Sequence, residues 1–262
     1  MALVWYEKDA DKNDSIIFQH RLFSKDGERN HLHHFHCGVE MVFVVKGDCE
    51  VFVDDETYVL HSGDVCYVDG IRTHKFCYSE GNECYVVVLS PGYVNLNNSL
   101  GSMAFPTVNR YNEGFDTIKE FLDFSFKNWD DTSLSFKQGF ADLLIGLMQR
   151  YYPILEKKKH RKNDKILFEV LKYINENCRT DLEIKELAAK FGYTENYFSS
   201  LFGRFVGMSY RDYINRCRML EYMRLRKERP KISTSEAAEL CGFGSVKSFY
   251  RAKKKFENEK DL

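Results

Sequence analysis

The feature that most constrains the fold is a register of apolar residues around position 190. Apolar side chains recur every three to four positions, stop at Gly192, and then resume. This period is typical of a helix with one buried face, and the glycine permits a tight corner between two such helices. The pattern therefore predicts a helix-turn-helix with its apolar face formed by Ile184, Leu187, Ala188, Tyr197, Phe198, Leu201 and Phe202.

The second helix of this unit carries polar side chains on its outer face. Polar side chains on a protruding helix can reach the base edges in the major groove of DNA. We therefore expect double-stranded DNA to contact Glu195, Asn196, Ser199, Ser200 and Arg204.

The charges of the chain are divided between its two halves. Residues 157–262 hold 25 Lys and Arg against 15 Asp and Glu, a net charge of +10, whereas residues 1–156 hold 13 against 24, a net charge of −11. A basic domain attracts the phosphate backbone of nucleic acids, so the charge also indicates DNA binding by the C-terminal half. A solvated surface on an ordinary helical domain is the alternative interpretation.

The length of 262 residues suggests about two domains. No apolar run approaches the roughly 20 residues that span a bilayer, so we expect no membrane association and a cytoplasmic protein. The eight cysteines contain no C-x-x-C pair. They are interpreted as reduced, buried thiols rather than as a disulfide framework or a zinc knuckle.

Short segments rich in Val, Tyr and Phe follow one another through the first ninety residues, with turn residues between them. So many short strands at even spacing predict a compact barrel, whose interior can hold one small ligand. The strands are expected at 41–45, 49–53, 57–60, 64–68, 73–77 and 83–89.

A group of polar residues lies within this barrel segment. His34 and His36 are two residues apart on a strand, so they point to the same face, and Glu40 and His74 could join them from neighbouring strands. Three imidazoles and one carboxylate form a set that suits a divalent metal. The spacing H-x-H-x3-E-x6-G resembles the first motif of the cupin barrel, whereas the second motif has Asp69 in place of proline and Ile71 in place of glycine.

Two interpretations of this group stay open. The four residues could bind a divalent metal, or they could form a hydrogen-bonded cluster that lines an empty pocket or one for an organic ligand. No other cofactor is expected. Sugars, small carboxylates and aromatic compounds would all suit a pocket lined by His34, His36, Glu40, Tyr67, His74 and Tyr85.

Two further helices are predicted between the barrel and the basic domain. Residues 115–129 and 134–155 each carry a broad apolar stripe. One face should pack on the barrel, and the other is either a homodimer surface or packed within its own domain. The polar residues 157–164 are interpreted as a linker.

A second, weaker copy of the helix-turn-helix follows a long helix at 210–227. Thr234, Ala237, Ala238 and Leu240 lead into Gly242 and Phe243, and then into a helix at 245–256. Two such heads on a connecting helix resemble the AraC family of bacterial transcription regulators, over roughly residues 166–256. The residues that carry the resemblance are Leu187, Ala188, Gly192, Phe198, Leu201, Phe202, Gly207, Met208, Ser209 and Tyr213 in the first copy, and Ala238, Gly242, Phe243, Phe249, Arg251, Lys254 and Lys255 in the second.

The second head departs from the family pattern. Lys253 stands where the family usually has an aromatic residue, and the closing glycine, proline and tyrosine-arginine segment is absent. We therefore expect this head to anchor to phosphates more than it reads bases, with a solvated C-terminal helix as the alternative. Its expected DNA contacts are Ser245, Lys247, Arg251 and Lys254.

These observations predict a two-domain protein. An all-β cupin-like barrel with an appended helix pair occupies residues 1–156, and an all-α double helix-turn-helix domain occupies residues 165–262. The resemblance implies a sequence-specific transcription regulator, not an enzyme, that responds to a small-molecule effector, forms a homodimer and activates genes through RNA polymerase. The alternatives are a cupin-type metalloenzyme, an isomerase or dioxygenase with an accessory DNA-binding tail, and a regulator whose barrel binds no ligand.

Overall fold

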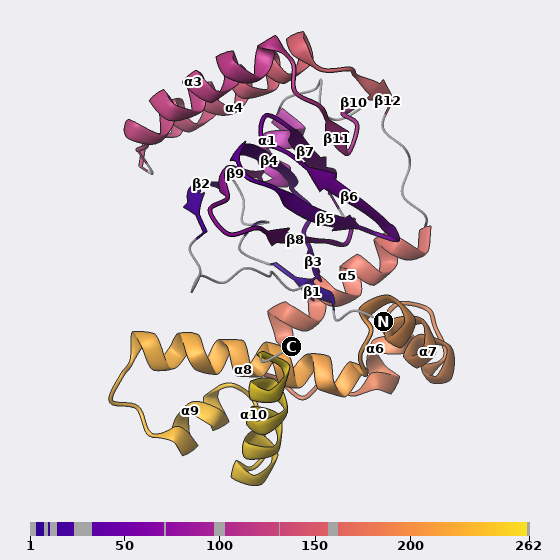
Figure 1. Ribbon diagram of the computed structural model, residues 1–262. Coiled ribbons are helices and arrows are strands. Elements are labelled where there is room, and N and C mark those ends of the chain that lie inside the picture. Colours follow the sequence, from indigo (N-terminus) through magenta and orange to yellow (C-terminus); the bar gives the residue numbers. More distant parts are fainter. Residues whose placement is uncertain are drawn as a thin grey trace. The chain divides into compact units, whose positions relative to one another are not determined.

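The computed structural model describes residues 4–7, 10, 15–23, 33–70, 72–96, 103–130, 132–156 and 162–260. Contacts divide the chain into two compact units, Trp5–His160, and Arg161–Leu262 together with Met1–Val4 (Figure 1). Residues 157–161 of the expected linker lie outside the described residues. Residues 162–164 are not linker, because the first helix of the second unit begins at Lys162.

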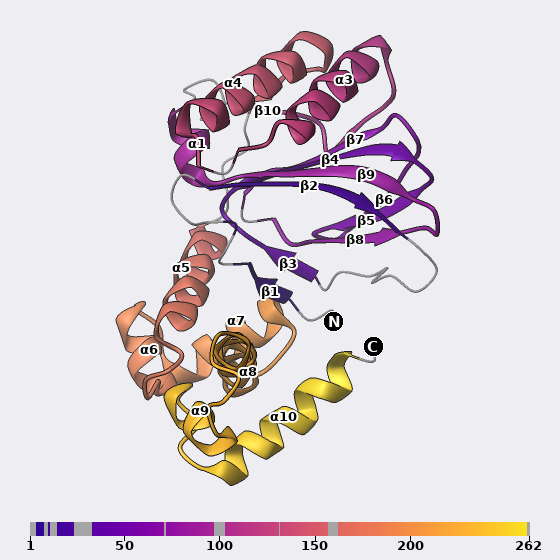
Figure 2. The ribbon, with the colours of Figure 1, turned by 90° about the vertical axis from the view of Figure 1, so that its left-hand side faces the viewer.

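The first unit is built on two five-stranded sheets, with strand orders β1-β3-β8-β5-β6 and β11-β7-β4-β9-β2. Figure 2 shows the two sheets one above the other, which confirms the predicted all-β domain. A short third sheet pairs β10 (Met103–Ala104) with β12 (Leu155–Glu156). The strands of the main sheets are β1 (Val4–Tyr6), β2 (Ile16–Leu22), β3 (His33–Phe35), β4 (Val39–Lys46), β5 (Cys49–Val53), β6 (Glu56–Leu60), β7 (Val65–Val68), β8 (His74–Tyr78), β9 (Glu83–Leu89) and β11 (Val108–Asn109).

Alternation along the strands divides the core of this unit into two layers. On β4, Val42 and Val44 face the space between the sheets, whereas Met41 and Phe43 face the opposite side. This is the period of two expected of a strand. The space between the sheets is packed mostly with small side chains, namely Val51, Val53, Cys66, Val68, Cys84, Val86 and Val88.

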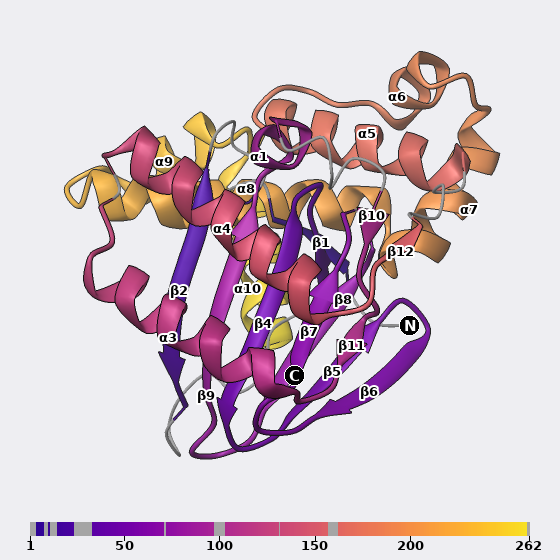
Figure 3. The same cartoon turned by 90° about the horizontal axis from the view of Figure 1, so that it is seen from above.

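Helices α3 (Glu113–Lys127) and α4 (Leu134–Tyr151) cover the outer face of the second sheet (Figure 3). Their apolar faces pack with the sheet into one core, in which the ring of Phe18 lies 5.0 Å from that of Trp129 and 4.7 Å from that of Phe140. The second helix ends earlier than the pattern predicted. Tyr152 has an extended backbone because Pro153 follows it, and a residue before proline disfavours helical geometry. A short helix, α1 (Pro91–Leu96), follows β9.

The second unit is helical, as predicted. It consists of α5 (Lys162–Asn177), α6 (Ile184–Lys190), α7 (Glu195–Val206), α8 (Tyr210–Glu228), α9 (Thr234–Leu240) and α10 (Val246–Lys260). The pairs α6–α7 and α9–α10 form the two helix-turn-helix heads, and α8 connects them. Phe198 and Phe202 are fully buried in the first head, and Phe249 is fully buried in the second.

The second head packs against the segment after α5 and against α8. Gly242 has a φ of +87°, and a Cβ there would lie 2.6 Å from the carbonyl oxygen of Arg179, so this turn requires glycine. The buried carboxylate of Glu221 on α8 accepts hydrogen bonds from Arg179 and Arg224. Lys255 on α10 forms an ion pair with Asp212 on α8, with Nζ and Oδ2 2.8 Å apart.

All eight cysteines are free thiols, and six are buried, whereas Cys37 and Cys77 are partly exposed. Among the helices in the described ranges, none has the length and apolar character needed to cross a bilayer.

Candidate functional site

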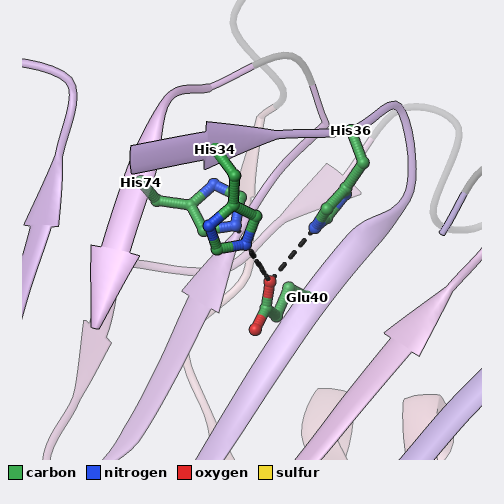
Figure 4. Close-up of side chains that lie close together, drawn as sticks. All are labelled: His34, His36, Glu40 and His74. Carbon is green, nitrogen blue, oxygen red and sulfur yellow. Dashed lines mark hydrogen bonds and ion pairs between the residues drawn. The ribbon is translucent and has the colours of Figure 1, made fainter. Parts of the chain in front are cut away.

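The barrel brings the four predicted polar residues to one point (Figure 4). His34 on β3 lies directly opposite His74 on β8, and His36 follows the end of β3. Glu40 reaches them from β4 in the other sheet. One nitrogen or oxygen atom from each residue lies within 4.8 Å of those from the other three.

The carboxylate of Glu40 is the centre of the cluster. Its Oε2 atom lies 2.9 Å from Nε2 of His74, 3.1 Å from Nε2 of His36 and 3.7 Å from Nε2 of His34. Burial alone would raise the pKa of this carboxyl group, but the three imidazoles around it hold the pKa well below its usual range. An imidazole nitrogen lowers this pKa only where it directs an N–H toward the carboxylate.

The other ring nitrogens determine what the histidines can offer. Nδ1 of His36 donates to the carbonyl oxygen of Gly38 at 3.1 Å, and Nδ1 of His74 donates to that of Arg72 at 2.8 Å. A carbonyl oxygen only accepts, so Nδ1 carries a proton in both rings. In a neutral ring Nε2 then presents a lone pair, and it faces the Glu40 carboxylate, which is also an acceptor.

Two facing acceptors need a proton or a cation between them. Burial, reinforced by His34, lowers the pKa of His74 to about 4, which disfavours a proton there at neutral pH. A divalent cation meets the same need, because metal-bound histidines commonly donate their other nitrogen to a backbone carbonyl. Ligands that share one such ion at about 2.1 Å lie about 3 to 3.5 Å apart, close to the separations around Glu40. The four residues therefore fit a metal.

The DNA-facing residues expected in the first head are all exposed on α7. Glu195, Asn196, Ser199, Ser200 and Arg204 lie away from the buried face formed by Phe198, Leu201 and Phe202. The helix ends at Gly207, which has a φ of 75°.

The residues expected in the second head are exposed as well. Lys247, Arg251 and Lys254 lie on α10, and Ser245 precedes its first turn. The Ser245 hydroxyl accepts a hydrogen bond from the backbone N–H of Ser248 at 3.1 Å, so this side chain also caps the helix.

Comparisons with known proteins give a family match in each part of the chain. Residues 187–260 match a helix-turn-helix domain family of the AraC type, and residues 24–91 match the cupin domain family. The C-terminal match is thus to a helix-turn-helix domain of the AraC type. The chain is a DNA-binding transcription regulator, with a cupin domain before its double helix-turn-helix domain.

The relatives of this regulator are distant. It is 23% identical to the probable transcriptional regulator LumQ of Photobacterium leiognathi over 227 residues, which cover 86% of this chain and 88% of that protein. It is 20% identical over 228 residues to an uncharacterised HTH-type transcriptional regulator of Staphylococcus aureus strain MRSA252. That alignment covers 85% of this chain but only 30% of the longer protein.

The fold of this regulator also matches solved structures of ToxT from Vibrio cholerae strain SCE256. The apo form of a ToxT variant gives a TM-score of 0.57 over 95% of this chain and 96% of that one. Wild-type ToxT with an unsaturated fatty acid bound gives 0.55 over 94% and 92%. Both are 14% identical to this regulator, so the likeness concerns the fold.

Two residues that we expected to line the effector pocket of this regulator lie elsewhere. Tyr67 faces the helix layer, where its ring lies 5.2 Å from that of Phe105. Tyr85 faces the same layer and donates its hydroxyl hydrogen to Asp123 on α3 at 2.6 Å. The expectation of one shared pocket was wrong for this pair, because adjacent residues of a strand alternate between faces.

Sequence reasoning also missed a residue beside His34. Oε2 of Glu7 lies 3.5 Å from Nε2 of His34. The two residues meet because β1 pairs with β3, and no local pattern in the sequence indicated that pairing.

Proposed function

We propose that this regulator binds a small-molecule effector in its N-terminal barrel, at a divalent cation held by His34, His36, Glu40 and His74. The observation that carries the proposal is the orientation of the imidazoles. Two of them are held through Nδ1 by backbone carbonyls, and all three direct Nε2 to the Glu40 carboxylate. This arrangement supports metal binding over an internal hydrogen-bonded cluster.

A bound cation would supply a positive charge inside an otherwise apolar barrel. Of the ligand classes that suit a small barrel, carboxylates gain most from such a charge, so we propose a small carboxylate as the effector. ToxT, which has the same fold, has been solved with an unsaturated fatty acid bound. That structure supports a carboxylate-bearing effector for this fold.

In the second unit, we propose that both heads contact adjacent segments of the major groove. The first head reads bases through its short polar side chains, above all Asn196 and Ser200, because such side chains can hydrogen-bond to base edges. The second head anchors to phosphates through Lys247, Arg251 and Lys254, because long cationic side chains suit the DNA backbone. The remaining proposed contacts are Glu195, Ser199, Arg204 and Ser245.

The outer face of the helix pair offers a surface for a second copy of the chain. Phe124 on α3 is 63% exposed, and Leu134 and Leu143 on α4 are 68% and 51% exposed. Large apolar side chains at this exposure favour an interface. We therefore propose a homodimer that acts in the cytoplasm as an activator, in contact with RNA polymerase and without enzymatic activity.

The experiment that tests this function combines metal analysis of the purified chain with a DNA shift assay. We expect about one divalent cation per chain, sequence-specific DNA binding, and a change in DNA affinity on addition of a carboxylate effector. Stoichiometric iron or zinc without DNA affinity would instead favour a cupin-type metalloenzyme. DNA binding with no cation and no response to effectors would favour a barrel without a ligand.

A further inference from the structure

A second carboxylate, that of Glu7, lies beside His34, at the edge of the histidine cluster. Its Oε2 atom is 3.5 Å from Nε2 of His34, the imidazole that stands farthest from Glu40, with a separation of 3.7 Å. The side chain of Glu7 is 41% exposed, whereas that of His34 is 12% exposed. Glu7 therefore approaches the cluster from its solvent side.

The backbone holds Glu7 at this position. Its N–H donates to the carbonyl oxygen of Phe35 at 2.9 Å, and Phe35 lies between His34 and His36 in the sequence. On the other side, the N–H of Ala10 donates to the carbonyl oxygen of Glu7 at 3.2 Å. Ala10 is 1% exposed and belongs to the core between the two sheets. The chain is thus anchored both at Glu7 and three residues after it.

We propose that Glu7 is a second carboxylate ligand of the cation, which completes the site from the solvent side. This inference rests on the cation proposed above. A divalent cation with three neutral imidazoles and the Glu40 carboxylate keeps a charge of +1. A net charge is costly in a buried site, so the Glu7 carboxylate neutralises it while no effector is bound, and an effector carboxylate would take its place. Cation binding then also ties Glu7, which follows β1, to His34 on β3.

The test uses Co²⁺ as the probe, because its visible absorption depends on the number and geometry of its ligands. The full chain is titrated with Co²⁺ as the wild type, as Glu7→Gln and as Glu50→Gln. Glu50 is an exposed glutamate on β5 and serves as the matched control. A Glu7→Asp variant keeps the charge on a side chain shorter by one methylene, and it covers the case in which Glu7→Gln does not fold.

We expect Glu7→Gln to bind Co²⁺ at least about tenfold more weakly than the wild type, with a changed visible spectrum. Glu7→Asp should give an intermediate affinity, and Glu50→Gln should match the wild type in affinity and spectrum. Two results would overturn Glu7 as a ligand while leaving the cation site in place. One is wild-type affinity and spectrum in Glu7→Gln, and the other is weaker binding with an unchanged spectrum. If the wild type itself binds no Co²⁺, the cation site fails, and this inference fails with it.

Discussion

His34 and His74 lie directly opposite each other on β3 and β8, with their ring centroids 4.2 Å apart. The two are 40 positions apart in the sequence, and strand register alone brings them together. Glu40 reaches the same point from the other sheet. The candidate cation site therefore depends on the packing of both sheets. Replacing any one ligand should abolish cation binding without disturbing the helical unit.

Replacing His36 by alanine should abolish stoichiometric metal binding. The change removes one of three imidazole ligands from a fully buried position. It should leave DNA affinity in the absence of effector unchanged, because His36 belongs to the first unit. Metal content by mass spectrometry and DNA affinity by fluorescence anisotropy check the two expectations. The matched control is His61→Ala, at an exposed histidine that pairs with Asp48. Equal metal content in the wild type, His36→Ala and His61→Ala would contradict a metal site at His36.

Replacing Asn196 by alanine should weaken binding to the preferred DNA sequence by about 1 to 3 kcal/mol, because an amide side chain can hydrogen-bond to a base edge. Binding to random DNA should change little, since phosphate contacts remain. Titration of both DNAs measures the difference. Asn128→Ala, at an exposed residue after α3, should behave like the wild type. Equal losses on the two DNAs would show that Asn196 does not read bases.

The sequence predicted the heads well because their determinants are local. Each head has its own apolar period, its own turn glycine and its own buried phenylalanine, Phe198 or Phe249. Within one head these features lie within about 25 residues of one another. The barrel motif was equally informative for His34, His36 and Glu40, because its spacing matches a known family. The exposed residues of α7 followed directly from the helical period.

Strand faces and strand partners were harder to predict. Tyr67 and Tyr85 lie on the helix side of their sheet, and a difference of one residue along a strand is enough to exchange the two faces. Glu7 was missed because β1 pairs with β3 across a long stretch of chain. Such pairings depend on the packing of the whole sheet, and the local sequence does not contain them.

Replacing Glu221 by glutamine should destabilise the second unit by about 1 to 3 kcal/mol. The buried carboxylate accepts hydrogen bonds from Arg179 and Arg224, which would lose their charged partner. Both arginines are about half exposed, so water limits the loss. Urea unfolding of residues 161–262, expressed alone, measures the loss in the free energy of unfolding. Glu228→Gln, at an exposed glutamate on the same helix, should cost less than about 0.5 kcal/mol. Similar losses in the two variants would refute the role of Glu221.

Acid should weaken the attachment of α10 to α8 through Asp212. Burial raises the pKa of this carboxyl group, but Lys255 and Ser209 more than offset it, so the pKa lies below its ordinary value of 3.8. A group with a lowered pKa stabilises the folded state above its ordinary pKa, and this contribution disappears as the pH falls through the folded value.

Wild-type residues 161–262 should therefore be more stable than Asp212→Asn at pH 7, by up to about 1 kcal/mol for a pair this exposed. The difference should shrink below about pH 4, where Asp212 becomes protonated. Urea unfolding of both proteins at pH 7 and below about pH 4 measures the difference in their free energies of unfolding at each pH. A difference between the two proteins that stays constant with pH would contradict a contribution from the ionised carboxylate.

The most direct measurement is the selection of bound sequences from a random DNA library by the full chain, followed by titration of the selected sequence. We predict an enriched sequence with two contacted segments about 10 base pairs apart, one for each head. At about 150 mM salt it should bind at least about 10³-fold more tightly than random DNA, and its affinity should fall steeply as the salt concentration rises. A library without enrichment, or a selected sequence bound no more tightly than random DNA, would contradict a sequence-specific regulator.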